Sequence, residues 1–120
     1  MDAAAKSLVA YGAYLLLNAI GLVFAPNTVL VLLGAPSTNE PWIRVLGLVV
    51  GEIGYYFIFA ARRGLSTFYP TTVYVRFVAS LVFVALVITK FGPWQLLIFA
   101  AVDLIAASWT KLSIKSNSEA

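Results

Sequence analysis

Four apolar stretches, each close to 20 residues long, constrain this chain more than any other feature. An α-helix of about 20 apolar residues is long enough to cross the hydrocarbon core of a bilayer. The stretches cover residues 7–25, 42–61, 71–89 and 94–112, and prolines or glycines stand between them. Because proline and glycine mark the starts and ends of helices, each stretch is predicted to form one helix. The expected fold is an all-α, integral membrane, four-helix up-and-down bundle that forms a single four-span domain over residues 1–120.

The composition excludes most of the chemistry that enzymes use. Charged residues make up 11% of the chain and hydrophobic residues 62%, whereas a soluble domain carries about 25% charged residues. The chain has no cysteine and no histidine, which removes disulfides, thiol chemistry and the usual zinc and haem sites. We therefore expect a non-enzymatic protein with no cofactor and no metal. The net charge of +3 is small, so nucleic acid is not an expected partner.

A short apolar segment follows the first long stretch but is too short to span a membrane. Asn27 is a typical N-cap residue, and Gly34 is typical of the position that follows a helix. A short interfacial helix is therefore predicted over residues 28–33. The first long stretch exceeds the apolar region of a removable signal peptide and lacks a small-residue cleavage site before Pro26, so it is expected to be the first span.

Basic residues flank the apolar stretches unevenly. If the four helices alternate in direction, most of these residues lie on one side of the membrane: Lys6, Arg62, Arg63, Lys111 and Lys115. The other side has Lys90 and, just inside the second helix, Arg44. Since cytoplasmic loops carry the excess of Lys and Arg, the N- and C-termini are predicted to face the cytoplasm.

Four charged side chains lie inside the apolar stretches: Arg44, Glu52, Arg76 and Asp103. A charge at bilayer depth costs roughly 2.5–3.5 kcal/mol on the lenient insertion scale, so these residues are expected to pair, to order the helices or to function. At the rise of an α-helix, Glu52 and Asp103 lie roughly 15 Å and 14 Å from the outer ends of their helices, near the midplane.

The third and fourth helices must be antiparallel neighbours, because only about four residues connect them. This arrangement brings Arg76 within reach of Asp103, and an intramembrane salt bridge between them is predicted. Three further polar residues could join them in one buried cluster: Asn18, Glu52 and Ser80.

Two roles for these polar residues remain open at this point. The charges could neutralise one another and hold the helices in order, as buried polar groups of membrane bundles commonly do. Alternatively, they could bind a ligand, a proton or an ion, with Glu52 or Asp103 as the counter-charge and Tyr55 as a wall. The residues of this ligand-binding hypothesis are Glu52, Asp103, Arg76, Asn18 and Tyr55.

Three glycines lie along the second helix at Gly47, Gly51 and Gly54. Small residues at this spacing allow two membrane helices to approach closely. They predict helix packing within the bundle, and a subunit interface is the alternative.

A few residues resemble the DoxX-like group of small bacterial four-helix membrane proteins. They are Asn18-x-x-Gly21, Phe24-x-Pro26 at the end of the first helix, and Arg44-x-x-Gly47 at the start of the second. The resemblance implies a four-helix bundle in a bacterial inner (plasma) membrane. Some members of the group are accessory subunits of membrane redox complexes, and the resemblance implies no catalytic residue.

The function expected is that of a small multi-pass membrane protein that serves as an accessory or scaffold subunit, or as a self-associating one. Its expected partners are the lipid bilayer and either a second copy or other subunits of a membrane complex. The alternative is a transporter or binder of a small amphipathic or cationic ligand, or a proton-coupled carrier, that uses a buried acid.

Overall fold

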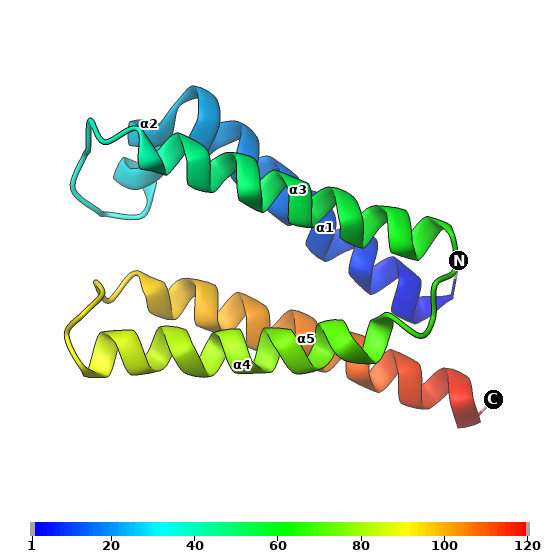
Figure 1. Cartoon of the computed structure of the whole chain (residues 1–120). Helices are drawn as coiled ribbons and strands as arrows, with labels where there is room; N and C mark the ends of the chain where they lie inside the picture. The colour runs from blue at the N-terminus through cyan, green and yellow to red at the C-terminus, as the bar shows by residue number, and fades with distance from the viewer. Residues whose placement is uncertain (1, 120) are drawn as a thin grey trace. The chain divides into compact units, whose positions relative to one another are not determined.

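The chain folds entirely into helices. The computed structural model describes residues 2–119, with side chains through residue 115, and this part contains five helices and no strand. The helices are α1 (Ala3–Phe24), α2 (Pro26–Leu32), α3 (Trp42–Arg62), α4 (Tyr69–Ile88) and α5 (Leu96–Glu119) (Figure 1). All but α2 are long and apolar enough to cross a membrane. This confirms the predicted all-α fold with four spans and a short helix after the first.

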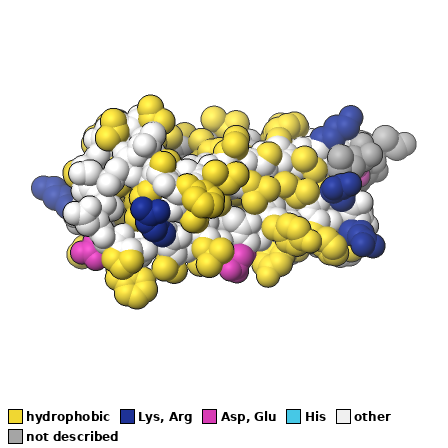
Figure 2. All heavy atoms as spheres, turned by 90° about the horizontal axis from the view of Figure 1, so that it is seen from above, with side chains coloured by type: hydrophobic (Ala, Val, Ile, Leu, Met, Phe, Trp, Pro, Cys, Tyr) yellow, Lys and Arg dark blue, Asp and Glu magenta, His cyan; other side chains and the backbone are white. Residues whose placement is uncertain are grey.

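Apolar side chains cover the sides of these helices. Figure 2 shows them along the length of the visible surface, whereas Lys and Arg side chains gather mostly toward its ends. Such a distribution suits a bilayer, whose core is apolar and whose headgroup regions are charged. By length, composition and surface, the chain is therefore a small multi-pass membrane protein.

The short helix α2 begins earlier than predicted. Pro26 is its first residue, and Asn27, the predicted N-cap, lies inside the helix. Proline tolerates this position because the first backbone N–H groups of a helix have no intrahelical acceptor. The Asn27 side chain instead accepts a 2.8 Å hydrogen bond from the backbone N–H of Thr38, which closes the loop that follows α2.

The first span begins earlier than predicted, and the last span ends later. Asp2 Oδ1 accepts a 2.8 Å hydrogen bond from the Ala5 N–H, and α1 begins at Ala3 because this cap satisfies one of its first donors. At the other end, α5 continues to Glu119, beyond residue 112 where the fourth apolar stretch ends. Ala120 lies outside the described residues.

The chain divides into two compact units. Unit 1 comprises Met1–Leu8 and Ala60–Ala120, and unit 2 comprises Val9–Phe59. In unit 1, α4 and α5 run antiparallel and side by side, as the short connection between them predicted (Figure 1). The Ser80 hydroxyl of α4 donates a 3.0 Å hydrogen bond to the Ala100 carbonyl of α5, so the two backbones lie close together.

In unit 2, α1 and α3 approach closely along a stripe of glycines. A β-carbon added at Gly54 would lie 2.8 Å from the Gly12 carbonyl oxygen, and one added at Gly51 would lie 3.0 Å from the Ala19 β-carbon. One added at Gly47 would lie 2.8 Å from the Leu22 β-carbon. Side chains at Gly47 and Gly54 would collide with α1, so the glycines allow α1 and α3 to pack closely within unit 2.

Candidate functional site

A cluster of buried polar side chains lies in unit 1, centred on Arg76 of α4. Arg76 is 3% exposed. Its Nε donates a 3.1 Å hydrogen bond to the Thr72 carbonyl oxygen, and its Nη2 donates one of 3.0 Å to Thr72 Oγ1. Thr72 lies one turn before Arg76, so both contacts orient the guanidinium along α4 toward the start of this helix. Because a buried charge is costly without hydrogen bonds, these contacts make the burial of Arg76 tolerable.

The cluster extends through two hydroxyl groups to the first turns of α1. Arg76 Nη2 also donates a 2.9 Å hydrogen bond to Thr110 Oγ1 of α5. Thr110 Oγ1 lies 2.6 Å from Ser7 Oγ, and Ser7 Oγ donates a 2.7 Å hydrogen bond to the Ala4 carbonyl oxygen. A continuous hydrogen-bonded chain thus ties α4, α5 and the start of α1 together within unit 1.

Neither Ser7 nor Thr110 was predicted to belong to a polar cluster. A signal for Thr110 was available, because it lies seven residues after Asp103 and so on the same face of α5. For Ser7 no comparable signal exists, since a serine near the start of a span is unremarkable without its partner.

Asp103 is the second buried charged residue of unit 1. It is 6% exposed, and its neighbours on α5 include the buried small residues Ala100 and Ala107. Small residues at these positions let another helix approach the acid closely. An Arg76–Asp103 ion pair is not among the contacts that the structure establishes for the described residues, and the predicted salt bridge stays a prediction.

Glu52 differs from this pair because its side chain is exposed. It lies in unit 2, on α3, and the residues one turn away on either side are also exposed: Leu48, Val49, Tyr55 and Tyr56. Arg76 and Asp103 belong to unit 1, and the expectation that Glu52 joins them in one buried cluster stays a prediction. The glycine stripe explains the difference, because Gly51 faces α1 and each step along a helix turns a side chain by about 100°.

Aromatic residues follow the exposed acid along α3. The ring centroids of Tyr55 and Tyr56 are 6.2 Å apart, and those of Tyr55 and Phe59 are 6.3 Å apart in a stacked arrangement. Tyr55 is 60% exposed. We call this surface the Glu52 face and define it as Leu48, Val49, Glu52, Tyr55 and Tyr56.

Asn18 and Arg44 both donate hydrogen bonds to backbone carbonyl oxygens of α1. Asn18 Nδ2 donates a 2.8 Å hydrogen bond to the Tyr14 carbonyl oxygen in its own helix. Arg44 Nη1 donates a hydrogen bond to the Val23 carbonyl oxygen at the end of α1. Since the last carbonyls of a helix lack intrahelical donors and carry partial negative charge, Arg44 stabilises the C-terminus of α1.

Neither the buried Arg76 cluster nor the Glu52 face could hold a metal ion, since no three His, Cys, Asp or Glu residues gather among the described residues.

Comparisons with protein-family models, curated proteins and solved structures find no match for this chain. The resemblance to the DoxX-like group therefore stays a prediction.

Proposed function

We propose that this protein is a non-enzymatic, self-associating membrane subunit, and that two copies meet through the Glu52 face. The observation that carries the proposal is an exposed acid in the middle of a membrane span. Glu52 lies ten residues after Trp42, the first residue of α3, which is roughly 15 Å along the helix. A carboxylate at that depth costs roughly 2.5–3.5 kcal/mol when it faces lipid, so a partner that covers it is favoured.

A second copy of the chain supplies suitable hydrogen-bond donors. In a dimer whose twofold axis is normal to the membrane, the two α3 helices run parallel and equal residues lie at equal depth. Tyr55 and Tyr56 lie three and four residues beyond Glu52, which is about 4.5–6 Å along the helix. A tyrosine side chain covers that distance, and its hydroxyl can donate to the carboxylate of the other copy. The face is thus complementary to itself.

Crosslinking in membranes tests this proposal, because the chain has no cysteine that would interfere. A Val49→Cys variant should form dimers with a short bismaleimide, whereas Val75→Cys, at an exposed position of α4, should not. Adding Glu52→Leu, or Tyr55→Phe together with Tyr56→Phe, should reduce the Val49→Cys dimer. Equal crosslinking at both positions, or a product of Val49→Cys with a different protein, would overturn self-association.

The other candidate function is binding of a cationic amphipathic ligand. It is favoured by the same carboxylate beside two exposed tyrosine rings, since aromatic faces attract cations. Tetraphenylphosphonium is a suitable probe, measured by equilibrium dialysis in detergent. This candidate would be favoured if the wild type binds the probe and Glu52→Gln does not, while helicity and melting temperature stay the same. If the wild type does not bind the probe, ligand binding of this kind is excluded.

We also propose the placement of the chain and the pairing of its buried charges. Both termini are proposed to face the cytoplasm of a bacterial inner membrane, because the basic flanks and the resemblance to the DoxX-like group support this. Arg76 and Asp103 are proposed to form an ion pair, because both are buried on neighbouring helices. The resemblance to the DoxX-like group also supports a role as an accessory subunit of a membrane complex, and such a subunit can also self-associate.

A further inference from the structure

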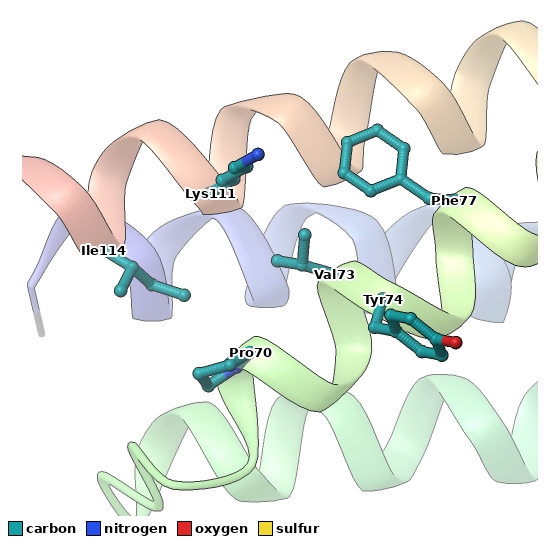
Figure 3. A pocket seen from close by; sticks show the side chains of 6 residues that line it. All are labelled: Pro70, Val73, Tyr74, Phe77, Lys111 and Ile114. Atoms are coloured by element: carbon teal, nitrogen blue, oxygen red, sulfur yellow. The ribbon is translucent and has the colours of Figure 1, made fainter.

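A hollow of about 290 Å³ opens between α4 and α5 near the end of unit 1 where α4 begins. Figure 3 shows its two walls: four side chains come from α4 and two from α5. The lining residues are Pro70, Val73, Tyr74, Phe77, Lys111 and Ile114. All but Lys111 are apolar or aromatic, so the hollow favours an apolar occupant with a charged group at one end.

A second hollow of about 370 Å³ continues the first along the same two helices. Phe77 lines both hollows, and the second reaches Val84 on α4 and Leu97 on α5. Ala100 and Ala101 form part of its floor, where larger side chains would fill the space. The two hollows follow one another along α4 and α5 on either side of Phe77, and we call them together the α4–α5 groove.

The groove is long enough for the acyl chain of a lipid in one leaflet. Pro70 and Val84 are fourteen residues apart, which corresponds to about 21 Å along α4. The hydrocarbon core is about 30 Å thick, so one leaflet accounts for about 15 Å. The groove therefore exceeds the depth of one leaflet and can hold an acyl chain over its whole length.

The charged end of the groove lies where lipid headgroups lie. Lys111 is exposed, and Lys115 is exposed one turn further along α5. The ring of Tyr74 is exposed on the facing wall, and tyrosine favours the interface between lipid and water. Basic side chains at this depth attract anionic headgroups.

We propose that the α4–α5 groove binds an anionic phospholipid from the leaflet on the side of the chain termini. One acyl chain lies along Phe77, Leu81 and Leu104, and the headgroup phosphate meets the Lys111 ammonium. The acyl chain of a zwitterionic lipid fits the groove equally well. Its headgroup carries no net charge, so the contact with Lys111 contributes less to its binding affinity.

Native mass spectrometry of the full chain in detergent tests this inference, with phosphatidylglycerol and phosphatidylcholine of identical acyl chains as probes. The wild type should retain phosphatidylglycerol in preference. Lys111→Gln should lower retention of phosphatidylglycerol by about fivefold and leave phosphatidylcholine unchanged, which corresponds to one basic residue near a membrane surface. Lys6→Gln is the matched control, since Lys6 is also exposed near the same end of unit 1 but does not line the groove.

A second variant tests the apolar part of the site independently of charge. Ala101→Phe places a ring in the groove at an exposed position, where the fold tolerates it, and should reduce retention of both lipids. Unchanged binding of both lipids in Ala101→Phe would overturn the groove as the site. Equal retention of the two lipids by the wild type, or an effect of Lys6→Gln as large as that of Lys111→Gln, would overturn the assigned headgroup contact.

Discussion

The Arg76 guanidinium of α4 donates a 2.9 Å hydrogen bond to the Thr110 hydroxyl of α5, 34 residues away in sequence. The same hydroxyl lies 2.6 Å from Ser7 Oγ in the first turns of α1. One threonine thus links a buried cation to two other helices. Hydrogen bonds to charged groups in a buried site contribute more than those between neutral groups, so loss of the Thr110 hydroxyl should weaken this cluster.

Thr110→Val should destabilise the protein by about 1–3 kcal/mol, because it removes an acceptor from a buried donor while keeping the side-chain volume. Denaturant unfolding in detergent, followed by circular dichroism, measures the change. Thr89→Val is the matched control, since the exposed Thr89 hydroxyl bonds only to carbonyls of its own helix. A Thr89→Val effect as large as that of Thr110→Val would contradict the role of the cluster.

The proposed Arg76–Asp103 pair predicts non-additive mutations. Arg76→Met or Asp103→Asn alone should cost about 3–5 kcal/mol, because a lone buried charge is the costly species. The double variant should cost less than the sum of the two, as residues in one network do. The same unfolding assay measures all three proteins, and strict additivity would show that the two residues are not coupled.

Gly54→Ala should separate α1 from α3 and destabilise unit 2. The added β-carbon would lie 2.8 Å from the Gly12 carbonyl oxygen, which belongs to the backbone and cannot swing aside. Overpacking of this kind costs about 1–3 kcal/mol. Ala13→Val adds volume at an exposed position of α1 and serves as the control. If the two variants melt at the same temperature, the close contact of the two helices does not matter for stability.

The proposed topology can be read from thiol labelling in whole cells. A cysteine introduced by Ser66→Cys, between α3 and α4, should react only with a membrane-permeant reagent. One introduced by Asn39→Cys, between α2 and α3, should also react with an impermeant reagent added from outside. Both positions are exposed, so access alone does not separate them. Labelling of Ser66→Cys from outside the cell would reverse the proposed orientation.

The helices themselves were predictable from local sequence. The apolar stretch at 42–61 became α3 (Trp42–Arg62) almost residue for residue, because its length, the preceding Pro41 and the following Arg62–Arg63–Gly64 all act locally. The boundaries that were predicted less well depend on side-chain contacts. Asp2 caps α1 early, and Asn27 closes a loop to Thr38 instead of capping α2. A sequence shows that such a side chain can cap, but not which backbone group it reaches.

The tertiary structure adds which face of each helix is covered. The helical rise alone places Glu52 and Asp103 near the middle of their predicted spans. Local sequence does not distinguish the two acids, whereas the folded chain buries Asp103 and exposes Glu52. The glycine stripe turns Glu52 away from α1, and the pairing of Thr110 with Ser7 and Arg76 needs three helices in one register. The physical reason is that length and hydropathy act along a single helix, whereas burial and hydrogen bonding depend on the rotation of one helix against another.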